Sequence, residues 1–253
     1  MNKRSCVALL ILGISLGTAY SQEKQALSEE QVKERLSFIE NALHSGQPRA
    51  KTWWYGWISG YSAGAAVMGG LAAAHWNDRK LDPLTQRQVA DRGFAKDMLV
   101  GSATFVLGVG GLVIDPFVPA YGPNRLRAML EGTPEERRLK LQKAEELLRE
   151  CARREREGRG WMTHLLNLGV NAAAGLVAVL AFHRPGSDGL LTFATGEAVS
   201  LLNIYSQPSR AISDLDNYEI KYLGKQGVPA GPEEERGLYF SRYPCGFSVG
   251  VRF

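Results

Sequence analysis

The pentapeptide Gly-Tyr-Ser-Ala-Gly at Gly60–Gly64 has the spacing of a hydrolase nucleophile elbow, in which the central serine attacks a carbonyl carbon. An elbow lies on a sharp turn between a strand and a helix, above a sheet of several strands. Residues 28–47 have the pattern of one helix, which leaves no room for those strands. A serine hydrolase that uses Ser62 is therefore the third of three functional hypotheses.

Close packing of helices is a second interpretation of the same stretch. Gly56, Gly60 and Gly64 recur at every fourth residue, and Gly69 and Ala73 repeat this spacing on a neighbouring stripe. A glycine inside a water-exposed helix costs about 1 kcal/mol relative to alanine, so these residues need a compensating contact. Small residues at this spacing let membrane helices approach closely. We expect the five residues to pack helices together, within the chain or between the copies of a homo-oligomer.

Polar residues inside otherwise apolar runs are the next candidates. Asn167 and Asn171 lie one helical turn apart in the run 161–183, and Glu197 interrupts the run 190–205. Polar groups are costly in lipid and often mark a functional interior, although they also form hydrogen bonds between helices. We expect these three residues to line a polar interior. A channel or transporter component is the second functional hypothesis.

The first 21 residues have the parts of a secretory signal peptide: basic Lys3 and Arg4, an apolar core, and small residues before Gln22. An uncleaved anchor is the alternative. Cleavage removes two of the 30 basic residues and none of the 26 acidic ones, which leaves 28 against 26. This near balance does not indicate a nucleic-acid partner. We expect an exported protein of the bacterial cell envelope, in a membrane or in the periplasm, whose partners are membrane lipid or envelope proteins.

No pattern indicates a metal or an organic cofactor. The four histidines lack the spacing of metal ligands, and Gly108–Gly111 lacks the spacing of a dinucleotide loop. Cys151 and Cys245 remain after signal cleavage. An even pair in an oxidising compartment could form a disulfide, and two independent thiols are the alternative.

The candidate residues lie on predicted helices. Ser28 and Gln31 have the spacing of a capping box, and the helix that they begin is expected to end at Gln47-Pro48. Thr133 is a suitable N-cap, with Pro134 after it, for a second charged helix. Alternating apolar residues in the last 17 positions predict a β-hairpin or a single strand. The uncharged runs are 53–74, 98–114 and 161–183, followed by 190–205, which carries only Glu197.

The order of these elements predicts a mainly α fold of two helical hairpin units, each preceded by an amphipathic helix. A shift of 108 residues places Trp53 on Trp161 and His75 on His183, which indicates an internal duplication. Two similar hairpins without common descent are the alternative. We expect a signal peptide over 1–21, a first unit over 22–120, a second unit over 121–215, and a loop with a β-like tail over 216–253.

The charges leave open whether the apolar runs enter a membrane. Trp53, Trp54 and Trp57 cluster at one end of a run, as an interfacial aromatic belt would. The connector 117–160 carries eleven Lys and Arg residues and would lie outside the cytoplasm after signal cleavage. That distribution reverses the positive-inside rule. A soluble or peripheral helical bundle in the periplasm is therefore the alternative to transmembrane helices.

The stretch Trp-Trp-Tyr-Gly-Trp-Ile-Ser-Gly-Tyr at 53–61, the Gly/Ala run after it and residues 97–116 resemble uncharacterised exported or membrane proteins of Gram-negative bacteria. The resemblance covers residues 50–120 and implies a location without an activity. Our first functional hypothesis is accordingly a non-enzymatic, membrane-associated envelope protein with a structural or interaction role.

Overall fold

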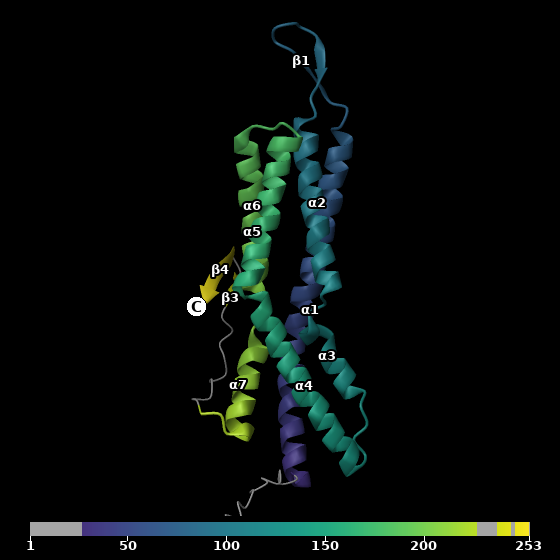
Figure 1. The fold of residues 1–253 in the computed structure, drawn as a ribbon, viewed down its shortest axis with the longest axis vertical. Helices are drawn as coiled ribbons and strands as arrows, with labels where there is room; N and C mark the ends of the chain where they lie inside the picture. Colours follow the sequence, from purple (N-terminus) through teal and green to yellow (C-terminus); the bar gives the residue numbers. More distant parts are fainter. Residues whose placement is uncertain (1–26, 227–236, 244–245, 253) are drawn as a thin grey trace, which may run out of the picture.

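The computed structural model describes residues 27–226, 237–243 and 246–252, and within them the protein is mainly helical (Figure 1). The predicted signal peptide, residues 1–21, lies outside the described residues. In chain order the elements are α1 (Glu29–Ala74), β1 (Arg79–Leu81), β2 (Gln88–Ala90), α2 (Gly93–Ile114), α3 (Val118–Arg127), α4 (Pro134–Gly158), α5 (Trp161–Leu176), the π-helix η1 (Val177–Ala181), α6 (Gly186–Ser206), α7 (Arg210–Leu223), β3 (Gly237–Tyr243) and β4 (Gly246–Arg252).

The molecule has two parts that share the long helix α1 (Figure 1). Four apolar segments run side by side and are here called the arms: residues 53–74 of α1, then α2, α5 with η1, and α6. The first part of α1, residues 29–50, forms the headpiece together with α3, α4 and α7. Connectors 75–92 and 182–185 lie at the far end of the arms, the tip, where the β1–β2 hairpin projects outward.

The headpiece has one apolar core, to which each of its helices contributes residues at helical spacing. Both predicted N-caps are confirmed, because Ser28 and Thr133 each exchange hydrogen bonds with the third residue of the helix that follows. On α1 the core residues are Val32, Leu36, Ile39 and Leu43, all of which are buried. The core consists of Val32, Leu36, Ile39, Leu43, Val118, Leu126, Leu141, Ala144, Leu148, Cys151, Ala152, Ala211, Leu215 and Tyr218.

The predicted end of the first helix at Gln47-Pro48 is wrong, because α1 runs unbroken from Glu29 to Ala74. A proline inside a helix removes one backbone hydrogen bond and costs roughly 3 kcal/mol. Packing offsets this cost. The side chain of Gln47 is buried and donates to the carbonyl oxygen of Ala120 at 3.1 Å. Trp53 is buried against Phe117, with ring centroids 4.8 Å apart.

Four elements are not predicted by the sequence patterns: β1, β2, α3 and α7. The strands β1 and β2 have three residues each, too few to show alternation. Helix α3 contains Pro119 and Pro123, which disfavour a helix when the sequence is read alone. Helix α7 continues past residue 216, where we expected a loop, because Ala211, Leu215 and Tyr218 form a stripe that is buried in the headpiece core.

The predicted C-terminal hairpin is confirmed by the backbone of β3 and β4, which pair antiparallel with Leu238 opposite Val251. Cys245 lies between these strands and outside the described residues. Its disulfide with Cys151 therefore stays a prediction.

Candidate functional site

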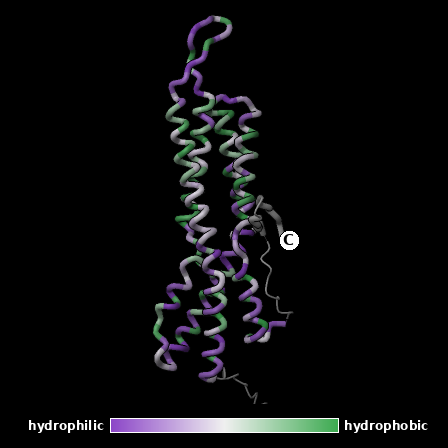
Figure 2. The backbone as a smooth tube through the Cα atoms, turned by 180° about the vertical axis from the view of Figure 1, so that it is seen from behind, coloured by the Kyte–Doolittle hydropathy of each residue, from purple (hydrophilic) through white to green (hydrophobic). Residues whose placement is uncertain are grey.

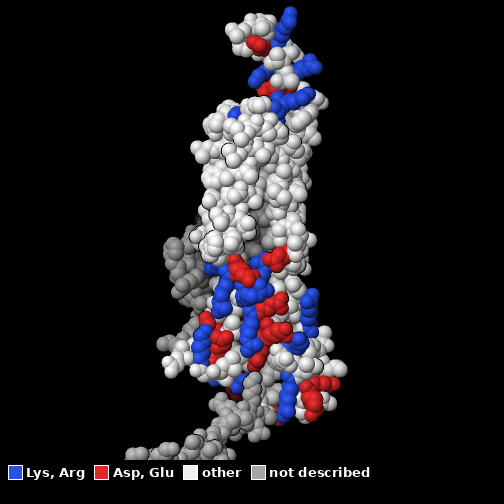
Figure 3. All heavy atoms as spheres, viewed as in Figure 1, with Lys and Arg blue, Asp and Glu red and all other residues white. Residues whose placement is uncertain are grey.

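The outer surface of the arms is apolar along their length. The hydrophobic part of the chain lies in the arms, between a polar tip and a polar headpiece (Figure 2). Figure 3 shows Lys, Arg, Asp and Glu gathered at the tip and over the headpiece. Four leucine or valine side chains are each more than half exposed: Leu107 and Val113 of α2, Leu166 of α5 and Leu180 of η1. A contiguous apolar surface of this kind marks a site of contact with lipid or with another protein.

Two segments, Gly93–Arg127 and Trp161–Ala181, are long and apolar enough to cross a membrane by length and composition. Within the apolar 18-residue stretch of each segment, only 6% and 17% of the residues, respectively, are buried inside the protein. The core helix of a soluble domain is mostly buried, since burial of its apolar face is what stabilises it. These segments are therefore apolar without being core helices.

Glycines in the α1–α2 hairpin make room for large side chains of the opposite helix. A Cβ atom at Gly64 would lie 2.9 Å from the ring of Phe105, and one at Gly108 would lie 2.9 Å from the ring of Tyr61. Gly69 likewise faces a serine of α2, at 3.2 Å. These three glycines set how closely the two helices approach.

The remaining small residues predicted to pack helices lie on the outside of α1. No described atom other than the helix itself lies within 4 Å of a Cβ built at Gly56 or Gly60, and Ala73 is exposed. Within the described chain they contact no other helix in this way. Their packing role would need a second copy or a helix of another protein, and it stays a prediction.

Ser62 lies in the middle of α1 and is exposed. The helix is continuous on both sides of it, so the strand-to-helix turn that a nucleophile elbow requires is absent at this position. The geometry around Ser62 therefore gives the hydrolase hypothesis no support.

The second hairpin, α5–α6, holds a polar cluster inside the apolar arms. Its helices meet at Gly175 and Gly189, where a Cβ on Gly175 would lie 2.6 Å from the carbonyl oxygen of Gly189. This approach lets the amide nitrogen of Asn171 donate to Oε2 of Glu197 and to Oγ of Ser200, both at 3.0 Å. Asn171 is only 4% exposed. We call Asn171, Glu197 and Ser200 the polar cluster.

Further polar residues lead from the polar cluster toward the headpiece. Asn167 lies one turn before Asn171 on α5 and is half-buried. On α6, the amide nitrogen of Asn203 is buried and has no hydrogen-bond partner among the described residues. Ser206 accepts a hydrogen bond from the indole of Trp57 on α1, at 3.0 Å. This bond joins the two hairpins at their headpiece end.

An ion cluster joins the two hairpins at the tip. The guanidinium of Arg184 donates to both carboxylate oxygens of Asp97, at 3.0 and 2.7 Å, and lies 2.6 Å from Asp188. Beside it, Lys96 donates to the carbonyl oxygen of Phe182 at 3.2 Å. Because Asp97 belongs to α2 and Arg184 to the α5–α6 connector, the cluster holds the tips of the hairpins together.

The headpiece buries a carboxyl group and a thiol on α4. Glu155 is 2% exposed, and its Oε2 accepts a hydrogen bond from the backbone N–H of Ile212 at 3.2 Å. Burial raises the pKa of Glu155 to about 8, although backbone hydrogen bonds oppose this shift. Burial also raises the pKa of Cys151, which is fully buried one turn earlier. A buried thiol with a raised pKa is unreactive, because the thiolate is the nucleophile.

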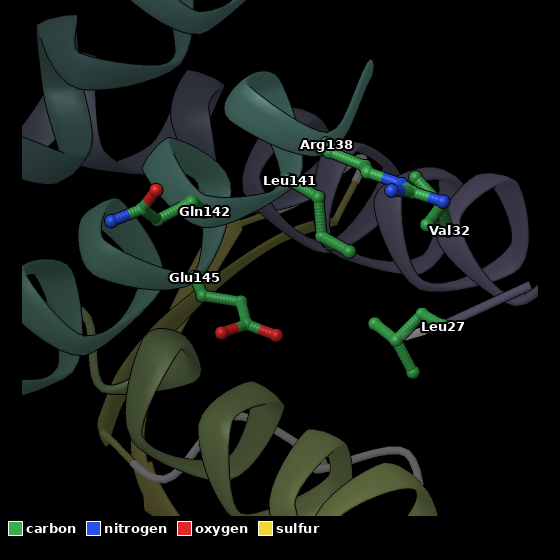
Figure 4. Close-up of a pocket in the computed structure, with 6 residues that line it drawn as sticks. All are labelled: Leu27, Val32, Arg138, Leu141, Gln142 and Glu145. Carbon is green, nitrogen blue, oxygen red and sulfur yellow. The ribbon is translucent and has the colours of Figure 1, made fainter. Parts of the chain in front are cut away.

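An open groove of about 280 Å³ lies between α1 and α4, beside α7 (Figure 4). Leu27, Val32 and Leu141 form its apolar part, and the carboxylate of Glu145 turns toward the open space. The hydroxyl of Tyr218 already donates to that carboxylate. The carboxylate of Glu145 is thus engaged by the headpiece itself, while Arg138 also lines the groove.

The sequence patterns do not single out Ser200, Arg184 or Asp97. The signal for Ser200 is its position three residues after Glu197, on the next turn of the same helix. The signal for Arg184 is that it alone is charged within the connector 182–185. Comparisons with protein-family models, curated proteins and solved structures find no match, so we infer the function from these residues alone.

Proposed function

We propose that this protein is a non-enzymatic, membrane-embedded component of the bacterial cell envelope, whose four arms cross a bilayer. The single observation that carries the proposal is the exposed apolar surface of the arms, which is bounded at both ends by charge. A helix of 22 residues such as α2 is about 33 Å long, close to the hydrocarbon thickness of a bilayer of roughly 30 Å.

The role that we propose is structural, with the headpiece as the part that contacts other envelope proteins. The headpiece has its own apolar core and a surface rich in both signs of charge, so its folding does not depend on lipid. The open small residues on the outside of α1 would suit a contact with a second copy.

Fractionation of the host envelope, followed by alkaline carbonate extraction of each membrane, tests the proposal directly. Carbonate strips peripheral proteins and leaves embedded helices in the pellet. We expect the protein in the pellet. Release into the supernatant would refute the proposal and would leave a soluble or peripheral bundle.

A matched pair of substitutions separates lipid from water around the arms. Leu107 on α2 is 62% exposed, and Leu139 on the headpiece is 54% exposed. In water, Leu→Arg at either position should change stability by less than about 0.5 kcal/mol. In a bilayer, Leu107→Arg should cost roughly 3 kcal/mol and reduce the amount in the membrane, while Leu139→Arg should not. Equal behaviour of the two variants would contradict a bilayer around α2.

Single cysteines at exposed positions test whether the tip and the headpiece lie on opposite sides. Leu84 at the tip is 92% exposed and Leu130 in the headpiece is 74% exposed. We expect an impermeant maleimide to label one of Leu84→Cys and Leu130→Cys in intact cells and the other only after lysis, against the unmodified protein as background. Labelling of both in intact cells would mean that the arms do not span.

Transport is a second candidate function, and the polar cluster favours it because it places a carboxyl group among apolar helices. Glu197→Gln should then change conductance or uptake without changing membrane retention. An enzymatic role would return if a fluorophosphonate probe labelled the protein and Ser62→Ala abolished the labelling.

A further inference from the structure

The carboxyl group of Glu197 has no partner of opposite charge within the arms. Residues 53–74, 98–114, 161–181 and 189–206 contain no Lys or Arg, and Glu197 is their sole Asp or Glu. Its Oε2 accepts from Asn171, and Oε1 has no protein partner among the described residues. This inference rests on the proposed function, since an ionised carboxylate in hydrocarbon is costly unless a cation neutralises it.

The geometry points to a reversible proton-binding site made by Glu197 with Asn171 and Ser200. The side chains of the polar cluster are held in place by the packing of α5 against α6. Asn171 is buried, and its amide oxygen lies beside Gly196, where a Cβ would be only 2.5 Å away. The same amide nitrogen contacts both Glu197 and Ser200, so it fixes the carboxyl group within the α5–α6 contact.

A proton suits this cluster better than a metal cation. Hard cations take about six oxygen ligands. The cluster offers the oxygens of three side chains, and α6 is an unbroken helix from Gly186 to Ser206, whose interior carbonyl groups are engaged in helical hydrogen bonds. A proton needs a single carboxylate oxygen.

On α5, the stripe that contains Asn171 is polar on one side only. Toward the headpiece, Asn167 and His164 continue the stripe of Asn171 on α5. Toward the tip, the corresponding positions are Ala174 and Ala178. Polar side chains of α5 therefore lie on the headpiece side of Glu197 and not on its tip side.

Among the side chains that the structure describes, no other titratable group forms a hydrogen bond or an ion pair with the polar cluster. On α5 the titratable group is His164, two turns nearer the headpiece. At the tip, Asp97 of α2 and Asp188 of α6 pair with Arg184, and Lys96 of α2 donates to the carbonyl oxygen of Phe182. The tyrosines of the arms are Tyr55 and Tyr61 on α1 and Tyr205 on α6. Strand β3 also lies beside α6 and carries one charged residue, Arg242.

A hydrophobic carbodiimide tests the inference on the full-length protein in membranes. The reagent adds to a protonated carboxyl group in an apolar setting, and the adduct is located by peptide mass spectrometry. We expect an adduct at Glu197, none in Glu197→Gln, and a rate that falls by up to about tenfold for each pH unit once the carboxyl ionises. Asp188, which is paired with Arg184, is the internal control and should remain unmodified.

A second set of reactions at constant pH contains Na⁺ or Li⁺. We expect no protection by either ion. Protection would mean a metal-cation site, and a rate independent of pH would mean that Glu197 does not exchange a proton. Either result overturns the inference, as does absence of the adduct.

Carbonate extraction of the same membranes separates the two proposals. An unlabelled protein in the pellet overturns this inference alone, whereas release from the pellet refutes the membrane proposal itself.

Discussion

The contact between α5 and α6 predicts that a single methyl group at Gly175 destabilises the arms. A Cβ there would lie 2.6 Å from the carbonyl oxygen of Gly189 and 3.4 Å from Cβ of Phe193. The nearest atom belongs to the backbone, so it cannot rotate away as a flexible side chain could. The two helices must separate by several tenths of an ångström, along the same contact that positions Asn171 against Glu197.

The size of the effect follows from two opposing terms. Overpacking a close contact costs about 1–3 kcal/mol, and replacing an interior helical glycine by alanine gains up to about 1 kcal/mol. Gly169 lies on the same helix, and no described atom of another element lies within 4 Å of a Cβ built there. Gly169→Ala therefore gains the helix propensity of alanine without overpacking a contact. The difference between Gly175→Ala and Gly169→Ala therefore isolates the overpacking cost of about 1–3 kcal/mol.

Thermal unfolding in a mild detergent, followed by the helical circular dichroism signal, measures that difference. For a protein of this size, 1 kcal/mol corresponds to about 2–4 °C, so Gly175→Ala should melt roughly 2–12 °C below Gly169→Ala. Equal melting temperatures would refute the reasoning, because they would show that α5 and α6 do not meet at Gly175. The hydrogen bonds of the polar cluster would then have no support.

Three further predictions concern the headpiece and the tip. The carboxyl group of Glu155 has a pKa of 4.5 in the unfolded chain and about 8 in the folded protein. The free energy of unfolding that this group contributes is therefore fully present below pH 4.5 and is lost as the pH rises to about 8. Glu155→Gln should flatten that decline in urea titrations from pH 5 to 9, and an unchanged slope would contradict burial as the cause. Arg184→Ala should lower stability by about 1–3 kcal/mol in thermal melts, whereas Lys80→Ala, which loses an exposed ion pair with Asp91, should cost under about 1 kcal/mol. In a Cys245→Ser background, Cys151 should react with a polar maleimide only after unfolding in SDS; rapid labelling of the folded protein would show that its thiol is not buried.

The parts of the fold that could be predicted from sequence are those set by local patterns. Capping spacing locates the starts of α1 and α4, and uncharged runs locate the arms to within a few residues. The path of α1 through Pro48 could not be predicted in this way, because it depends on contacts such as Trp53 with Phe117. These residues lie 64 positions apart in the chain, beyond the reach of any periodic pattern.

The candidate site follows the same division. Asn171 and Glu197 are evident as polar residues in apolar runs, but their pairing depends on the register that Gly175 and Gly189 set. The spacing of glycines on α1 likewise does not reveal which stripe faces α2. Gly64 receives an aromatic ring, whereas Gly60, one turn earlier, faces outward. Side-chain size alone does not determine which stripe of α1 faces α2, since both positions carry glycine.

The topology changes how the basic residues of the connector 117–160 should be counted under the positive-inside rule. Each predicted unit contains two arms, so the chain leaves the headpiece and returns to it twice, at Pro116 and at Pro208. The basic residues of the connector 117–160 thus belong to a folded headpiece, where Lys140 is buried between two glutamates.

The positive-inside rule applies most strongly to short loops. The short tip connectors carry five basic residues: Arg79, Lys80, Arg87, Arg92 and Arg184. A cytoplasmic tip with an external headpiece satisfies both this rule and signal cleavage, so Leu130→Cys should be labelled in intact cells and Leu84→Cys only after lysis. The reverse pattern would mean that the N-terminal segment is not cleaved as a signal peptide.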